Sequence, residues 1–406
     1  MKTICFVVPA FPVISETFVV NQILVAKQLG YAIKILTQRI LPISASSQQE
    51  LLEQEGLMDN VTELGYKIPK NKFERRIRAL SYILTHFVAW NQVLHVQFRK
   101  RFSTLPFQML FFDQFKDVDV FHVQFAQAGM ELAKMKSIGV INAEVITTFH
   151  GYDAHFKNKT EQDKLTKRYK ELLKLSSSIT VNTTYLASIV KKIGVEEAKL
   201  HIIPMGVDVN FFYNEKDRKL HFNKKVKLLS VGRLVSFKGF KYSIYAVKQV
   251  VDAGYDVIYT IAGEGQEEKD LKSLIETLDL KAHVIMLGKQ TQNQVKALMQ
   301  NHDIFVMSSI ADSTGRQETQ GVVTAEAQAM GLPVVAFKSG GVPYTISDKI
   351  TGYLVEEKDT DALAQAVINI LEMPDSYQKM SESAREYAVK EFSNAIMGQR
   401  FKMLYG

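Results

Sequence analysis

The chain has 406 residues, of which 46% are hydrophobic and 23% are charged; this is the composition of a folded protein, and the length excludes a single ordinary domain. The one cysteine, Cys5, excludes an internal disulfide framework and a cysteine-based zinc site, and it indicates a reducing compartment. The net charge of +7 suits phosphates, anionic lipids or nucleic acid, but no basic-aromatic motif for nucleic acid is present.

Short apolar runs alternate along the chain with longer amphipathic segments. The apolar runs predict buried strands at residues 4–8, 32–36, 118–123, 145–149, 179–181, 227–231, 257–262, 284–287, 304–307 and 333–336. The amphipathic segments predict helices at residues 19–29, 163–175, 241–253, 267–278, 293–299 and 361–371. Such alternation predicts an α/β fold with parallel sheets covered on both faces. No stretch approaches eighteen apolar residues, so no transmembrane helix is expected.

The alternation restarts once, after a polar and charged stretch that begins near residue 214. We therefore predict a first domain at residues 1–208, a linker at 209–226, a second domain at 227–380 and a C-terminal helix at 381–406. Each half is long enough to bury a core of its own.

Residues 70–101 differ from the rest of the N-terminal half. Apolar residues recur there at helical spacing, namely Phe73, Ile77, Leu80, Leu84, Phe87, Leu94 and Phe98. Basic residues crowd both ends, namely Lys70, Lys72, Arg75, Arg76 and Arg78, and then Arg99, Lys100 and Arg101. One interpretation is a basic amphipathic surface that touches anionic lipid. The other, slightly favoured from the sequence, is a pair of core helices with solvated charged ends.

Two cations follow the end of a predicted strand in the segment 232–239, Gly-Arg-Leu-Val-Ser-Phe-Lys-Gly. Ligands of α/β sheets bind at this edge, and a diphosphate needs several cationic donors. Arg233 and Lys238 are therefore candidates for holding a diphosphate. Taken alone, the segment is also explained by solvated loop charges.

The turn Gly263-Glu264-Gly265 follows the next predicted strand. It begins like the dinucleotide fingerprint, but Glu268 stands where the third glycine should be. Its two glycines favour either a close backbone approach to a ligand or a plain strand–helix turn.

The stretch from Glu318 to Gly331 predicts a helix that starts near Gly321, and its first amides would form an anion site. Glu318 precedes this helix and Glu326 lies inside it. Eight helical positions span roughly 12 Å, whereas the two carboxyls of a retaining hydrolase lie about 5 Å apart. The two glutamates are thus predicted to touch separate parts of one elongated ligand. The alternative is a charge favourable to the helix dipole plus an exposed helical glutamate.

Three features of the N-terminal half could carry chemistry. His150 follows a predicted strand, where its side chain either faces a ligand cleft or bonds to its own loop. His122 lies inside an apolar strand and is predicted to be a satisfied core histidine. Asp117 and Asp119 resemble a metal-binding DxD motif, but no third ligand is near, so we predict a strand-entry turn and no metal site.

In their order and conjunction, these stretches resemble the large GT-B glycosyltransferase family usually called family 4. Its GRL-x-x-x-KG loop, GEG turn and Glu-x7-Glu segment are matched at residues 232–239, 263–265 and 318–326. Its LG turn, NGVD signature and GG-x-P-E loop resemble residues 287–289, 203–208 and 340–343. Residues 11–18 are similar to the branch that builds capsular and exopolysaccharides, as in colanic acid synthesis.

The resemblance implies two Rossmann-like, doubly wound parallel-sheet domains that face each other across a cleft, with the acceptor bound in the first and the nucleotide-sugar donor in the second. It implies transfer of a sugar with retained configuration from a nucleotide diphosphate, UDP being favoured over GDP. The expected acceptor is a glycan or a lipid-linked oligosaccharide. The expected location is the cytoplasm, and peripheral contact with the anionic inner face of the cell membrane is left open. No cofactor, metal or nucleic-acid partner is expected. The C-terminal helix is expected to cross back to the N-terminal domain.

By the same resemblance, His150 would lie beside the reacting sugar and Glu318 would contact it. Arg233 and Lys238 would hold the diphosphate, and Glu326 would bond the ribose. The backbone at Gln320, Gly321 and Val322 would hold sugar and phosphate. The nucleotide would be flanked by Gly263, Gly288 and Lys289. The acceptor would be faced by Ser15, Glu16 and Thr17.

The sequence departs from the family pattern at four positions. Met205 replaces an Asn, Tyr344 a Glu, Ser308 a frequent Pro, and Gln320 an aromatic residue or Ile. The change at Gln320 falls near the expected donor sugar, so it leaves the sugar's identity open. Two alternatives remain, an epimerase or hydrolase on the same fold and a non-catalytic nucleotide-sugar-binding protein. A nicotinamide dehydrogenase is disfavoured, because no complete G-x-G-x-x-G follows a strand.

Overall fold

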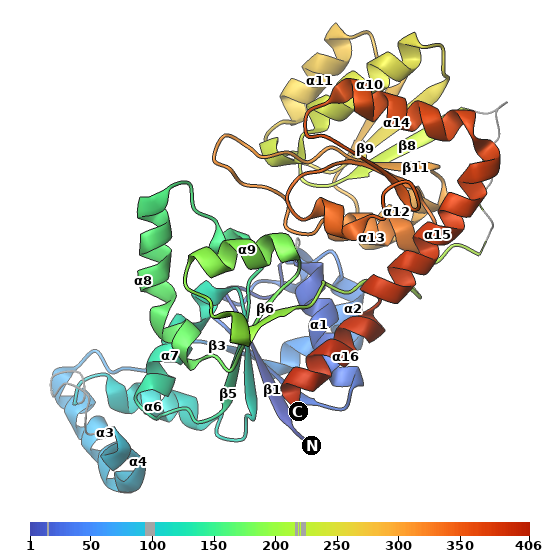
Figure 1. Cartoon of the computed structure of the whole chain (residues 1–406). Coiled ribbons are helices and arrows are strands. Elements are labelled where there is room, and N and C mark those ends of the chain that lie inside the picture. The colour runs from blue at the N-terminus through green and yellow to red at the C-terminus, as the bar shows by residue number, and fades with distance from the viewer. Residues whose placement is uncertain (14–15, 94–101, 216–217, 219, 221–224) are drawn as a thin grey trace. The chain divides into compact units, whose positions relative to one another are not determined.

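The computed structural model describes residues 1–13, 16–93, 102–215, 218, 220 and 225–406, and the chain divides into two compact units (Figure 1). Unit 1 comprises residues 1–181, 190–201 and 402–406, and unit 2 comprises 182–189 and 202–401. The last five residues, at the end of the predicted C-terminal helix, thus belong to unit 1. The linker at 209–226 stays a prediction.

Unit 1 is built on a seven-stranded sheet in the order β3-β2-β1-β4-β5-β6-β7. The pairings from β3 to β6 are all parallel. Its strands are β1 (Thr3–Val8), β2 (Ala32–Thr37), β3 (Val61–Glu63), β4 (Val120–Gln124), β5 (Glu144–Thr148), β6 (Ser178–Val181) and β7 (Leu200–Ile202). Its helices are α1 (Thr17–Gln28), α2 (Gln49–Gln54), α3 (Lys72–Thr85), α4 (Phe87–Gln92), α6 (Leu105–Asp113), α7 (Met130–Ser137) and α8 (Lys159–Leu175).

Unit 2 is built on a six-stranded parallel sheet in the order β10-β9-β8-β11-β12-β13. Its strands are β8 (Val226–Val231), β9 (Val257–Ala262), β10 (Val284–Gly288), β11 (Ile304–Met307), β12 (Val334–Phe337) and β13 (Gly352–Val355). Its helices are α10 (Phe240–Asp252), α11 (Glu268–Thr277), α12 (Gln292–Gln300), α13 (Val322–Ala329), α14 (Thr360–Glu372) and α15 (Pro374–Phe392). Two further helices, α9 (Thr184–Lys192) and α16 (Asn394–Tyr405), each run from one unit into the other.

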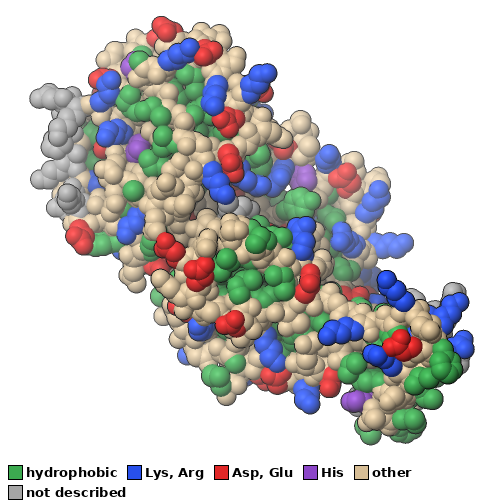
Figure 2. Space-filling model, turned by 180° about the vertical axis from the view of Figure 1, so that it is seen from behind, with side chains coloured by type: hydrophobic (Ala, Val, Ile, Leu, Met, Phe, Trp, Pro, Cys, Tyr) green, Lys and Arg blue, Asp and Glu red, His purple; other side chains and the backbone are tan. Residues whose placement is uncertain are grey.

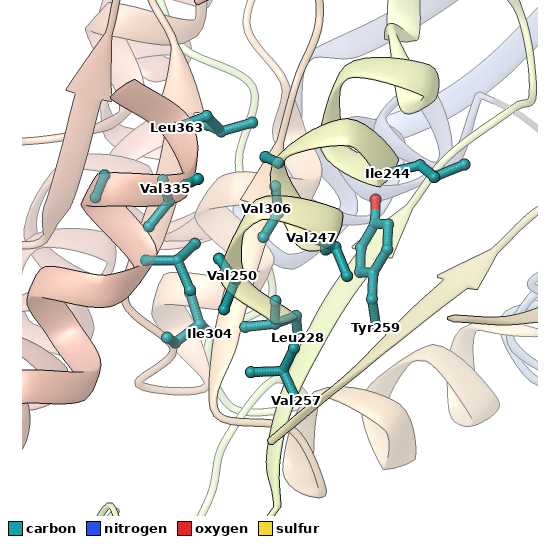
Figure 3. Packing of buried hydrophobic residues seen from close by; sticks show 14 of the residues in the cluster. Leu228, Ile244, Val247, Val250, Val257, Tyr259, Ile304, Val306, Val335 and Leu363 are labelled. Atoms are coloured by element: carbon teal, nitrogen blue, oxygen red, sulfur yellow. The ribbon is translucent and has the colours of Figure 1, made fainter. Parts of the chain in front are cut away.

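The core of unit 2 forms where α10 and α14 cover the sheet (Figure 3). Val247 of α10 and Leu363 of α14 pack with strand residues such as Leu228 and Val306, and all four side chains are 3% exposed or less. Burial of one such side chain stabilises a fold by about 1.5–3 kcal/mol. Packing of this kind holds the strand ends, and therefore the loops that follow them, in fixed positions.

The ten predicted strands and six predicted helices are all confirmed as elements of the structure, and the α/β fold class is confirmed with them. Cys5 is fully buried in β1, as predicted. His122 is a satisfied core histidine, because its ring nitrogens bond the hydroxyls of Tyr405 and Thr148, each at 2.7 Å. Asp119 accepts from the Thr3 amide at the entry to β1.

The described part of the segment at 70–101, residues 70–93, does not form the core helix pair that the sequence favoured. Five of its apolar side chains are more than half exposed, namely Phe73, Ile77, Leu80, Leu84 and Phe87. The other two, Leu94 and Phe98, and the basic residues 99–101 lie outside the described residues. Among the helices that the structure describes, none has the length and hydrophobicity needed to cross a bilayer.

Candidate functional site

The loops that follow β8 and β11 meet at the carboxyl edge of the unit 2 sheet. These strands are neighbours in the sheet although β9 and β10 separate them in the sequence. The strand order reverses between them, and such a switch point is where α/β sheets bind ligands. The predicted residues Arg233 and Lys238 lie on the first loop, and Glu318 lies on the second.

Lys238 and Glu318 form an ion pair across these two loops. The Lys238 Nζ donates to Glu318 Oε2 at 2.5 Å, and the two side chains are only 14% and 16% exposed. The carboxylate also accepts from the amides of Thr319 and Gly321, just before α13. Burial raises the pKa of Glu318, but Lys238 and these amides more than offset it and hold the pKa below its ordinary value. A charged, water-poor pair therefore lies beside the N-terminus of α13.

The backbone around Glu318 is fixed from two sides within unit 2. On one side, the Gly341 amide donates to the Glu318 carbonyl at 2.7 Å, and a Cβ at Gly341 would come within 1.8 Å of the Thr319 oxygen. On the other side, Thr183 Oγ1 donates to the same Thr319 oxygen at 2.7 Å. The Gly-Gly of the 340–343 loop is thus a steric requirement for the position of Glu318.

The turns after β8, β9 and β10 pack backbone against backbone. The Gly263 amide donates to the Gly288 carbonyl at 2.8 Å. A Cβ on Gly263, whose φ is +152°, would lie 1.8 Å from the Gly232 oxygen. The predicted nucleotide turns are therefore brought together, and glycine is required at Gly263.

The other predicted site residues of unit 2 are not part of the Lys238–Glu318 ion pair. Arg233 and Lys289 are exposed and contribute no bond to it. Gly321 is in the left-handed region with φ +78°, and Val322 is the first residue of α13, as the sequence predicted. Glu326 follows one turn later, where burial raises its pKa to about 7.

One cation near the pair was missed by the sequence analysis. The Arg316 guanidinium lies 4.5 Å from the centroid of the Phe237 ring, and Lys238 Nζ lies 5.6 Å from the same centroid. Phe237 therefore links cations from both loops. The only signal in the sequence was a basic residue two positions before Glu318.

In unit 1, His150 follows β5 and is 9% exposed. Because an amide oxygen only accepts, His150 Nε2 donates to Gln124 Oε1 at 2.7 Å. Its ring centroid lies 4.6 Å from that of Phe18. Burial lowers the pKa of His150 to about 3, so the ring is neutral. Its backbone amide donates to Asp153 of its own loop at 3.0 Å, whereas its ring is bonded to Gln124 of the neighbouring strand β4.

Two of the three predicted acceptor residues lie at the same edge of this sheet. Thr17 begins α1, Glu16 precedes it, and the next residue, Phe18, contacts His150. Burial raises the pKa of Glu16 to about 7. Ser15 lies outside the described residues.

Two family models together match most of the chain. Residues 34–211 match Glycosyltransferase Family 4, and residues 212–387 match Glycosyl transferases group 1. The chain belongs to the family 4 glycosyltransferases. Its two parallel-sheet units are those of the GT-B fold.

Curated relatives match the family 4 chain over nearly its whole length. The WcaL protein of Salmonella typhimurium, named as a colanic acid biosynthesis glycosyltransferase, is 26% identical over 99% of this chain and 98% of its own. The amylovoran biosynthesis glycosyltransferase AmsK of Erwinia amylovora is 27% identical over 95% of both chains. Among solved structures, Anabaena HepE in complex with UDP has a TM-score of 0.75 and 18% identity, over 100% of this chain and 99% of its own.

Two of the four departures from the family 4 pattern contact each other. The Met205 amide donates to Gln320 Oε1 at 2.8 Å, and Gln320 Nε2 donates back to the Met205 carbonyl at 3.1 Å. Gln320 is fully buried, so its side chain joins the Glu318 loop to the segment at 203–208. A third departure, Ser308, donates to the Gly239 carbonyl at 3.0 Å beside Lys238.

We predict that Gln320→Leu lowers the free energy of unfolding by about 1–3 kcal/mol, because the amide and carbonyl of Met205 would lose their partner. Met205→Leu keeps that backbone pairing and is expected to cost less than about 1.5 kcal/mol. Urea unfolding followed by circular dichroism measures both. Equal losses in the two variants would show that this pairing is not what stabilises the loop.

Proposed function

We propose that this protein transfers a sugar from a nucleotide diphosphate to an acceptor hydroxyl with retention of the anomeric configuration. The observation that carries the proposal is the Lys238–Glu318 ion pair at the switch point, beside the first amides of α13. A ligand with a negative diphosphate and a neutral sugar matches this combination of ammonium, amides and carboxylate.

In the proposed reaction, the bond between the anomeric carbon and the diphosphate oxygen breaks. The acceptor oxygen bonds to that carbon from the same face, and the acceptor proton passes to the departing phosphate oxygen. Lys238, Arg233 and the amide of Val322 would stabilise the charge that grows on the diphosphate, while the amide of Gly321 holds Glu318 in place. We therefore propose that no metal ion is required.

Glu318 and His150 are proposed to contact the sugar. Glu318 has a lowered pKa and would act as a charged acceptor for sugar hydroxyls. His150 is neutral because burial lowers its pKa, so it would act as a hydrogen-bonding group rather than as an acid. Glu326 is proposed to accept from the ribose hydroxyls.

We further propose UDP as the donor nucleotide and a lipid-linked oligosaccharide as the acceptor, at the inner face of the cell membrane. HepE is described in complex with UDP, which supports the first choice. WcaL and AmsK are named for colanic acid and amylovoran biosynthesis, which supports a role in exopolysaccharide synthesis.

The test is a panel of UDP- and GDP-sugars, incubated with the protein in EDTA, with and without a lipid-extract acceptor. Acceptor-dependent release of nucleotide, with an α-linked product by NMR from an α-linked donor, is the expected result. Release without acceptor would favour an epimerase or hydrolase instead. Tight donor binding without nucleotide release would indicate a non-catalytic binding protein. Activity that needs added metal would overturn the proposal that no metal ion is required.

A further inference from the structure

Helix α3 has two apolar faces, and one of them is not packed. Its buried residues Ala79, Tyr82 and Ile83 face neighbours in unit 1 that include α6. Another face carries four large apolar side chains that are 53% to 73% exposed, namely Phe73, Ile77, Leu80 and Leu84. At about 100° per residue, these four lie within roughly 60° of arc, and the centre of that arc lies roughly 140° from the buried face. An ordinary surface helix would carry polar residues there.

Helix α4 extends this exposed apolar surface. Phe87 and Val88, at its start, are 58% and 76% exposed, whereas Trp90 is buried. Figure 1 shows α3 and α4 beyond α6, away from the sheet of unit 1. Figure 2 shows hydrophobic side chains gathered over these helices, with Lys and Arg side chains beside them. We call Phe73, Ile77, Leu80, Leu84, Phe87 and Val88 the α3–α4 face.

The charge around the α3–α4 face is strongly positive. Between residues 67 and 90 there are six basic residues and one acidic residue, Glu74, which pairs with Arg78 at 2.8 Å. Lys72 and Arg76 are exposed, and Arg76 lies next to the apolar arc, about 40° from Leu80. The face therefore combines an apolar centre with a basic border.

We propose that the α3–α4 face docks on an anionic lipid bilayer, with its apolar side chains in the acyl boundary and its basic side chains among the headgroups. The apolar side chains match the acyl boundary of such a bilayer, and the neighbouring Lys and Arg side chains match its anionic headgroups. A second copy of the chain fits less well, because two copies of this face would bring like charges together. The docking rests on unit 1 alone and is independent of the proposed transfer reaction.

The test is flotation of the full chain with vesicles of phosphatidylcholine, with and without phosphatidylglycerol. Binding is expected only to the anionic vesicles and is expected to weaken at high salt. Leu80→Gln/Leu84→Gln keeps helix propensity and removes apolar area, so we expect at least tenfold weaker binding. Lys72→Gln/Arg76→Gln is expected to weaken binding about 25-fold, at roughly fivefold for each basic residue.

The matched control is Ile350→Gln/Met373→Gln in unit 2, where the two side chains are 58% and 53% exposed. This control is expected to bind vesicles like the original chain, and all variants are expected to keep its circular dichroism spectrum and thermal midpoint. Folded Leu80/Leu84 variants that still bind fully would overturn the proposal. A dimer in light scattering that these variants dissociate, without vesicle binding, would overturn it in favour of a second copy. Neither readout depends on sugar transfer.

Discussion

Replacing Lys238 by Ala is expected to lower kcat for sugar transfer by about 10²–10³-fold, because the variant loses one preorganised charge at the point where charge develops. Lys238 is suited to this role since its ammonium is 14% exposed and held at 2.5 Å by Glu318. The measurement is nucleotide release at saturating donor and acceptor. A raised donor KM with unchanged kcat would instead show that Lys238 binds ground state and transition state equally.

The same substitution leaves Glu318 buried without its cation, so a loss of stability must be separated from a loss of catalysis. We expect Lys238→Ala to lose about 1–3 kcal/mol of unfolding free energy at neutral pH, less than a fully buried pair, because the amides of Thr319 and Gly321 remain. The lowered pKa of Glu318 means that the pair stabilises the fold above the unfolded-state pKa. The difference in unfolding free energy between the original chain and Lys238→Ala is therefore expected to shrink as the pH falls through the folded-state pKa of Glu318.

A double variant, Lys238→Met/Glu318→Gln, is the matched control. Removing both charges is expected to restore most of the stability and none of the rate. Recovery of kcat in this folded double variant would show that neither charge takes part in the reaction.

The strands and the principal site loop could be predicted because their signals are local. Buried parallel strands are continuous apolar runs, and the residue after each run falls at the carboxyl edge of the sheet. Lys238 could therefore be assigned to that edge, whereas Glu318 was placed only before the start of a helix. Their direct pairing depends on β8 and β11 being neighbours, which no local pattern encodes.

The contacts that the sequence did not reveal join residues far apart in the chain or depend on which face is buried. Met205 was identified only as a departure and Gln320 as a departure and through its backbone, whereas the contact between the Gln320 side chain and the Met205 backbone joins residues 115 positions apart. Arg316 could be placed over Phe237 only with both loop conformations in hand. In α3, helical periodicity gave the helix correctly, but with two apolar faces it could not say which one packs.

Replacing Glu326 by Gln is expected to stabilise the protein at pH 8 and to weaken donor binding. Burial raises the pKa of Glu326 from 4.5 to about 7, so the folded state disfavours the charged form. Below pH 4.5 the carboxyl is neutral in both the folded and the unfolded state, and the protein keeps its full stability. As the pH rises from 4.5 towards 7, the unfolded state ionises before the folded state does, so the free energy of unfolding falls. We expect a gain of about 1–3 kcal/mol for the variant at pH 8 and little gain at pH 4.5.

The donor effect of Glu326→Gln should have the opposite sign, because hydrogen bonds from ribose hydroxyls to a charged acceptor are about twice as strong as neutral ones. A rise in donor KM of about tenfold or more at pH 8 is expected, and urea titrations at the two pH values supply the stabilities. The control is Glu382→Gln on α15, an exposed helical glutamate, for which neither change is expected. Equal stabilisation at both pH values would mean that titration of Glu326 is not the cause. An unchanged donor KM would show that Glu326 does not bind the donor. Its burial would then be a result of helix packing alone.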